Sequence, residues 1–281
     1  MRSPEAGTES TPQADVKATN IRIPPIFQDG WEIYAQDLAE ASLSQRSHGL
    51  GVFRNYYASN GVAPPVEKGK EALEKMFDSY RGQGDDETTV GADGTMRYFT
   101  QDLELNLENA ELLIPLEICR VQEIGAMNKE GFVEGWRAVG CPTLAKQKAY
   151  IATQIKALST DMAVYKRVYR YVFVCAKERG QKALPLDTAI EYWRVLFAPP
   201  GMTWVTDTTD WTALWFEFLS AKWTKSVNKD MWHQTLEFLQ KAVQDESLSF
   251  WNEDGAWPSV IDEFVVYAKE KKGILEKMET D

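Results

Sequence analysis

The sequence predicts an all-α protein, and two observations carry this prediction. From Val66 onward, large apolar residues recur at the three- and four-residue spacing of a buried helical face, in one segment after another. The runs of β-branched residues that mark strands are absent from the sequence, apart from two residues near Val90. We therefore expect about ten helices after residue 65, packed into one multi-helix domain over residues 66–272.

The composition restricts the partners and the compartment. The chain has a net charge of −11, which argues against nucleic acid as the main partner because phosphate binding needs a basic face. No run approaches the roughly 18 apolar residues of a membrane span, and the start of the chain lacks the apolar stretch of a signal peptide. Three cysteines without a CxxC pair suit a reducing compartment. We expect a protein of the cytoplasm and nucleus, without a membrane partner.

The first 65 residues give weak structural signals. Residues 1–25 are rich in Ser, Thr, Pro and Ala, which is typical of a disordered tail. Residues 26–65 hold aromatic residues with poor periodicity; Gly51 to Gly61 fits one short helix, and the residues up to Pro65 fit a linker.

Helical periodicity begins at Val66 and continues to the end of the domain. Pro115 is expected to kink or divide the third helix, Gly140 to cap the end of the fourth, and Asp187 to cap the start of the seventh. The expected helices before the last pair lie within residues 66–81, 94–105, 107–122, 127–141, 141–158, 161–178, 186–197 and 210–225. Residues 198–210 are expected to form a surface insertion, and residues 273–281 a charged, frayed tail.

The stretch from Asp230 to Glu270 resembles a docking surface more than a catalytic site. It is expected to be a helix, an acidic loop ended by Gly255, and a second helix with Pro258 in its first turn. Asp230 and Asp262 lie near the starts of these helices. On spacing alone both fit helix-stabilising roles, because a carboxylate in a first turn favours the helix dipole.

Three kinds of chemistry have candidate residues in the sequence, but the residue patterns do not favour them. The acidic loop from Asp85 to Asp93 suggests calcium binding, but neither register places both the central glycine and the final glutamate that a calcium loop needs. Cysteine catalysis needs a base, and only His48 and His233 exist, while each cysteine lies among apolar neighbours. Paired carboxylates such as Asp262 and Glu263 fit solvated or capping groups. We expect no metal, no cofactor and no catalytic residue.

Five blocks of the sequence resemble one known family, in the same order and at similar spacing. The resemblance is to the defective in cullin neddylation family, with a fungal-like pattern, and it covers roughly residues 66–272. The blocks are Val90–Leu105, Lys129–Cys141, Gly180–Phe197, Lys229–Phe238 and Gly255–Glu270.

This resemblance implies a potentiating-neddylation domain, an all-helical fold with EF-hand-like helix pairs that lack calcium. Members act as scaffold-type ligases that are not enzymes themselves. They hold a cullin C-terminal domain and the neddylation conjugating enzyme together, so that the modifier passes from that enzyme to a cullin lysine; a cullin-bound RING protein is a possible further partner. The family's cullin-binding patch falls on Asp230, Ala256 and Asp262, and all three identities are kept. Two carboxylates beside a small residue can pair with a basic cullin surface.

A second family site is an apolar pocket for the acetylated N-terminus of the conjugating enzyme. The alternative reading of these positions is an ordinary core. By spacing, the pocket falls near Ala92, Thr95, Leu112, Leu113, Cys175, Tyr192 and Val195.

Outside the five blocks the resemblance weakens, and other functions stay open. Only Arg54 to Gly61 resembles the end of the ubiquitin-associated domain that many members carry, so residues 26–65 fit a remnant of that domain plus a linker. The alternative functions are a calcium-sensing EF-hand-like module and a ligase that forms its own thioester on a cysteine.

Overall fold

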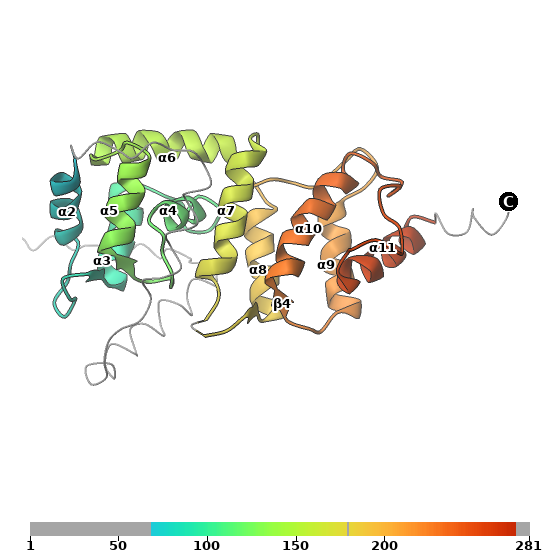
Figure 1. The fold of residues 1–281 in the computed structure, drawn as a ribbon. Helices are drawn as coiled ribbons and strands as arrows, with labels where there is room; N and C mark the ends of the chain where they lie inside the picture. The colour runs from blue at the N-terminus through green and yellow to red at the C-terminus, as the bar shows by residue number, and fades with distance from the viewer. Residues whose placement is uncertain (1–68, 179, 274–281) are drawn as a thin grey trace, which may run out of the picture.

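A computed structural model describes residues 69–178 and 180–273, and within them it confirms the all-α prediction (Figure 1). Ten α-helices and one short π-helix occupy these residues. The predictions for residues 1–65, including His48, and for the tail beyond Gly273 lie outside the described residues. The helices are α2 (Lys70–Asp78), α3 (Ala92–Arg97), η3 (Tyr98–Asp102), α4 (Leu113–Ile118), α5 (Lys129–Ala138), α6 (Leu144–Leu158), α7 (Met162–Cys175), α8 (Leu186–Leu196), α9 (Trp211–Lys222), α10 (Lys229–Ala242) and α11 (Ser259–Lys271).

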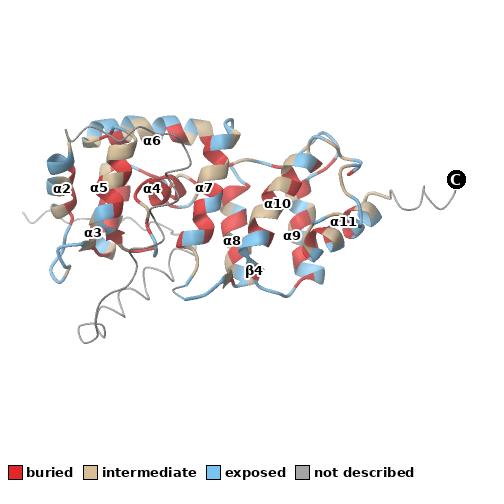
Figure 2. Ribbon diagram, in the orientation of Figure 1, coloured by how far each residue is buried: buried red, intermediate tan, exposed pale blue. Residues whose placement is uncertain are grey.

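The helices form one elongated array with α7 near its middle (Figure 1). The elements α2 to α6 lie on one side of α7, with α6 crossing one edge of the array, and α8 to α11 lie on the other side. Helix α7 packs against α4 and α6 on the first side and against α10 on the second. Buried residues gather on the helix faces that point into the array, as amphipathic periodicity requires (Figure 2).

Two very short antiparallel ladders connect loops that precede helices. Strand β1 (Thr89–Val90) pairs with β2 (Met127–Asn128), and β3 (Ala183–Leu184) pairs with β4 (Val227–Asn228). The sequence indicated only the residues near Val90, because a two-residue strand has no periodicity to read. The second ladder places the starts of α8 and α10 beside each other.

A stack of aromatic rings joins the helices around α7. The indoles of Trp193 on α8 and Trp232 on α10 are nearly parallel with centroids 5.0 Å apart, and the ring of Tyr169 on α7 stacks on Trp232 at 4.8 Å. Tyr169 Oη accepts a hydrogen bond from Trp193 Nε1 and donates one to the Trp232 carbonyl, both at 2.8 Å. Such satisfied buried aromatic groups fix helix positions more strictly than aliphatic packing does.

Two local predictions are wrong. Pro115 neither kinks nor divides a helix: it lies in the first turn of α4, where its missing N–H leaves no hydrogen bond unmade. Asp187 is not the N-cap of α8; Pro185 holds that position, and Asp187 lies in the first turn. Gly140 does follow the end of α5 with a φ of 70°, as predicted for a capping glycine.

Candidate partner-binding surfaces

Asp230 is held at the start of α10 by its neighbours and is itself exposed. The side chain of Asn228 caps the helix by accepting a hydrogen bond from the backbone N–H of Met231 at 2.8 Å. Met231 and Trp232 are buried, which anchors the first turn from inside. The Asp230 carboxylate therefore faces solvent from a rigid turn.

Asp262 lies in the first turn of α11 and is partly buried. Its Oδ1 accepts a hydrogen bond from Trp251 Nε1 at 2.9 Å. Lys269 Nζ lies 4.8 Å from the centroid of the Trp251 ring, which places a cation over the same indole. Trp251 thus restricts the rotation of the Asp262 carboxylate, a contact with a predicted site residue that the sequence alone did not reveal.

Ala256 is exposed in the loop before α11, and aromatic packing holds this loop in place. The backbone N–H of Gly255 donates to the Asn252 carbonyl at 3.0 Å, closing the turn before Ala256. The next residue, Trp257, packs edge-on against Phe238 of α10 at 5.9 Å between centroids, and Phe264 of α11 meets Phe238 at 5.5 Å.

The three predicted residues therefore lie on two packed helices and their connection. Ala256 lies three residues before the first residue of α11, and Asp262 lies in the first turn of that helix. Asp230 lies about 12 Å along the axis of α10 from Phe238, the residue that contacts α11. Together they present two carboxylates with a small side chain and no bulk at Ala256, an arrangement that suits a partner carrying basic side chains.

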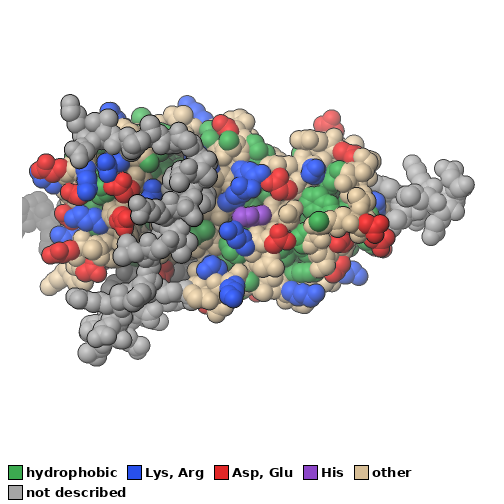
Figure 3. All heavy atoms as spheres, in the orientation of Figure 1, with side chains coloured by type: hydrophobic (Ala, Val, Ile, Leu, Met, Phe, Trp, Pro, Cys, Tyr) green, Lys and Arg blue, Asp and Glu red, His purple; other side chains and the backbone are tan. Residues whose placement is uncertain are grey.

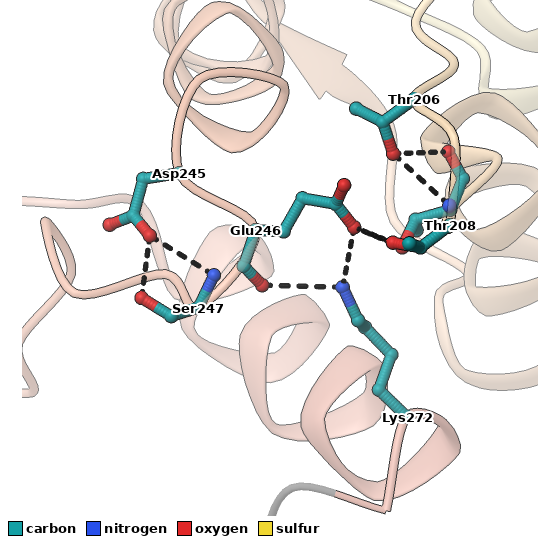
Figure 4. A network of polar contacts seen from close by, with 7 residues as sticks. Thr206, Thr208, Asp245, Glu246, Ser247 and Lys272 are labelled. Atoms are coloured by element: carbon teal, nitrogen blue, oxygen red, sulfur yellow. Dashed lines mark hydrogen bonds and ion pairs between the residues drawn. The ribbon is translucent and has the colours of Figure 1, made fainter.

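Polar contacts hold the long connection between α10 and α11 (Figure 4). The Glu246 carboxylate accepts hydrogen bonds from Thr208 and Thr209 of the 198–210 segment and pairs with Lys272 Nζ at 3.1 Å. The pKa of the Glu246 carboxyl falls to about 2, and hydrogen bonds from the threonine hydroxyls are the largest cause. The segment predicted to be a surface insertion is thereby attached to the loop that carries Ala256.

Basic side chains lie beside Asp230, in spite of the negative net charge. In Figure 3, Lys and Arg side chains lie around the purple histidine, which is His233. Burial lowers the pKa of His233, the nearby Arg170 and Lys229 lower it further, and Asp230 acts in the opposite direction. His233 is therefore neutral at pH 7, and Asp230 lies at the edge of a positively charged surface.

The seven predicted pocket residues come from four helices and their margins. Ala92 and Thr95 lie on α3, Leu112 and Leu113 at the start of α4, Cys175 at the end of α7, and Tyr192 and Val195 on α8. Five of them are buried, and only Ala92 and Val195 are partly exposed. Helices α4 and α7 pack directly against each other. Burial raises the pKa of the Tyr192 phenol, and the nearby Cys175 raises it further. The role of these residues as a pocket stays a prediction.

The cysteines match the prediction of buried, unreactive thiols. Cys119, Cys141 and Cys175 are all buried, and burial raises the pKa of each; that of Cys175 rises to about 12. A nucleophilic cysteine needs a lowered thiol pKa instead.

The described residues contain neither a cluster of metal ligands nor a helix that could span a membrane. No group of three or more His, Cys, Asp or Glu side chains within residues 69–178 and 180–273 is arranged to hold a metal ion. In the loop of the calcium alternative, Asp85 and Asp86 accept hydrogen bonds from the backbone N–H groups of Gly82 and Thr88. None of the helices described is both long enough and apolar enough for a membrane span.

Comparison with known proteins agrees with this geometry. A family model described as cullin binding matches residues 146–267, which include Asp230, Ala256 and Asp262. The fold and this match place the chain in the class of helical proteins with a cullin-binding domain.

Similar proteins define the family more closely. The chain is 37% identical over 239 residues to "Defective in cullin neddylation protein 1" of Pyricularia oryzae, which covers 80% of this chain and 85% of that protein. The protein of the same name from Yarrowia lipolytica is 34% identical over 196 residues, covering 70% and 77%. Human "DCN1-like protein 5" is 30% identical over 193 residues, covering 68% and 75%. The chain belongs to the defective in cullin neddylation family.

Proposed function

We propose that this protein is a scaffold-type co-ligase for cullin neddylation, which binds a cullin C-terminal domain through Asp230, Ala256 and Asp262. One observation carries the proposal: in a chain of this family, the two carboxylates project from the first turns of α10 and α11 on a frame of buried aromatic rings. Because the helix starts are anchored and Trp251 orients the Asp262 carboxylate, this surface loses little conformational freedom when a basic surface binds.

The second partner in this proposal is the neddylation conjugating enzyme. Its acetylated N-terminus would enter between α3, α4, α7 and α8, near Cys175 and Tyr192. Since most of the predicted lining is buried, entry requires side chains such as Leu113 to move, or the partly exposed Ala92 and Val195 to mark the opening. A RING protein bound to the cullin completes the assembly, which acts in the cytoplasm and nucleus.

The proposed role needs no catalytic residue in this chain. The conjugating enzyme brings its own cysteine, and the scaffold contributes proximity and orientation, which alone can be worth several kcal/mol. The buried thiols, with their raised pKa values, are consistent with this role and not with a thioester on this chain. The calcium-sensing alternative finds no support in the comparisons.

A reconstituted neddylation assay tests the proposal. Cullin with its RING protein, the conjugating enzyme and the charged modifier are mixed with and without this chain, and the rate of cullin modification is measured. Asp262→Lys and Asp230→Lys should each reduce cullin affinity by roughly tenfold or more, because each replaces an attractive charge by a repulsive one. If both variants stimulate neddylation like the unaltered protein, the assignment of the site is wrong.

Two controls make this assay specific. Glu263→Lys introduces the same charge change at an exposed residue next to Asp262, and it should leave the rate unchanged. A variant without cysteines, Cys119→Ala with Cys141→Ala and Cys175→Ala, should keep its stimulation provided that circular dichroism confirms folding. Loss of activity in a folded cysteine-free variant would favour the thioester alternative.

A further inference from the structure

The surface formed by α7 and α10 beside Asp230 carries more positive charge than its surroundings. Lys166 and Arg170 lie one helical turn apart on α7, and Lys229 and His233 lie one turn apart on α10. Besides burial, Arg170, Lys229 and Lys166 each lower the pKa of His233, so all three cations lie near its imidazole ring. We call Lys166, Arg170, Lys229 and His233 the basic face.

The cations of this face are only partly neutralised. Lys166 and Arg170 share a single carboxylate, that of Glu237, with Arg170 Nη2 at 3.7 Å from Oε1. Lys229 has no ion-pair partner among the residues that the structure describes. One turn beyond Arg170 on the same stripe of α7, the apolar side chain of Val174 is 40% exposed. The face thus offers unpaired positive charge with an apolar spot beside it.

The face is also rigid. Trp232 Nε1 donates to the Tyr169 carbonyl at 2.9 Å, and Tyr169 Oη donates to the Trp232 carbonyl at 2.8 Å, so α7 and α10 are joined from inside by two hydrogen bonds. The backbone positions from which these side chains project are therefore fixed relative to one another, which lowers the entropic cost of binding a flexible segment.

The chain itself contains a segment of matching chemistry. Residues 29–40 (DGWEIYAQDLAE) include four carboxylates, Asp29, Glu32, Asp37 and Glu40, and neither lysine nor arginine. Two aromatic residues, Trp31 and Tyr34, lie among them and suit an apolar spot such as Val174. Residues 41–68 join this segment to the described domain, and their extended length of about 90 Å is enough to reach any face of it.

We propose that residues 29–40 bind the basic face within the same molecule, with their carboxylates against Lys166, Arg170 and Lys229 and an aromatic ring near Val174. The attraction is an intramolecular one, so its strength depends on the effective concentration that the connecting residues set. Because Asp230 borders the basic face, the bound segment lies next to the surface proposed for the cullin and adds negative charge there. Binding of this segment to the basic face requires no cullin, so it can be measured in the isolated chain.

Zero-length crosslinking of the full chain tests this proposal. A carbodiimide activates a carboxylate, and a lysine amine in contact with it then forms an amide bond with loss of the urea by-product. Mass spectrometry should find amides between the carboxylates of residues 29–40 and Lys166 or Lys229 roughly tenfold more often than to Lys146 and Lys156 on the exposed side of α6, a preference of about 1.4 kcal/mol. High salt should abolish the preference.

Charge exchange provides the control. Asp29→Lys, Glu32→Lys, Asp37→Lys and Glu40→Lys together should remove the crosslinks, and adding Lys166→Glu with Lys229→Glu should restore them with amine and carboxylate exchanged. Crosslinks spread equally over all lysines, or no recovery in the exchanged chain, would overturn the proposal. A mixture of ¹⁴N- and ¹⁵N-labelled chains distinguishes binding within one molecule from binding between two copies. Crosslinks that join the two isotopes would mean that a second copy supplies the segment, and this result would also refute the proposal.

Discussion

Trp251→Phe isolates the role of one hydrogen bond in the proposed cullin site. The substitution keeps an aromatic ring for Lys269 to cover but removes the Nε1 donor that holds Asp262 Oδ1 at 2.9 Å. A hydrogen bond to a charged group contributes about 1.5–3 kcal/mol, and the partial exposure of Asp262 reduces the expected loss of stability below this range, to about 1 kcal/mol. The freed carboxylate must then be reordered by the cullin, at roughly 0.5–1.5 kcal/mol per side chain.

The measurement has two parts. Urea unfolding should show the loss of about 1 kcal/mol in unfolding free energy. Calorimetric titration with a cullin C-terminal domain should show roughly a two- to tenfold weaker affinity.

Trp223→Phe is a matched control for this experiment. Lys225 Nζ lies over the Trp223 ring at 4.8 Å, the same distance as for Lys269 over Trp251. Among the described residues, however, the buried Nε1 of Trp223 has no hydrogen-bond partner. Trp223→Phe therefore loses the same kind of ring contact without losing a hydrogen bond, and cullin affinity should not change. If Trp251→Phe binds the cullin as tightly as the unaltered protein, or if both substitutions weaken binding equally, the idea that Trp251 orients Asp262 is refuted.

Three further predictions concern stability and reactivity. Burial raises the pKa of the Glu117 carboxyl, although the nearby Arg167 opposes this. The contribution of Glu117 to stability is therefore full below pH 4.5 and is lost as the pH rises through the folded-state pKa. Between pH 4.5 and 7, urea unfolding should show Glu117→Gln gaining stability relative to the unaltered protein. Hydrogen bonds lower the pKa of the Glu246 carboxyl to about 2, so its contribution to folding stability is present above pH 4.5 and is lost as the pH falls toward 2. In Glu246→Gln, the free energy of unfolding should therefore fall less steeply with pH over that range. An unchanged dependence on pH would contradict this prediction. The thiols of Cys119 and Cys175 should react with an aromatic disulfide reagent at pH 8 only at the rate of unfolding, and fast labelling of the native protein would show that they are accessible.

Amphipathic periodicity predicted the longer helices well where one face is buried and apolar, as on α7, α8, α10 and α11. Leu236 and Leu239 on α10, and Phe264 on α11, are buried as their spacing required. The local errors at Pro115 and Asp187 are of another kind: several residues near a helix start can serve as its first residue, and tertiary packing decides among them.

The predicted site residues were found by resemblance, and the contacts that position them could not be read from the sequence. The bond from Trp251 to Asp262 spans a loop whose path depends on Phe250 and Trp257 packing against α10. The ladder of β3 with β4 joins segments more than 40 residues apart through two residues each. Contacts of this kind come from the whole fold, so neither propensity nor periodicity encodes them.

The stack of Trp193 on Trp232 joins α8, where two of the predicted pocket residues lie, to α10, where Asp230 lies. A scaffold that binds two proteins must keep a constant distance between its two binding sites, since only then do the reacting groups of the bound proteins meet. Flat rings locked by hydrogen bonds resist bending, whereas an aliphatic contact would yield by sliding. The increase in transfer rate that such a scaffold gives thus depends on its stiffness as well as on its affinity for each partner. Thinning the stack with Trp193→Leu would then slow transfer even where both partners still bind with full affinity.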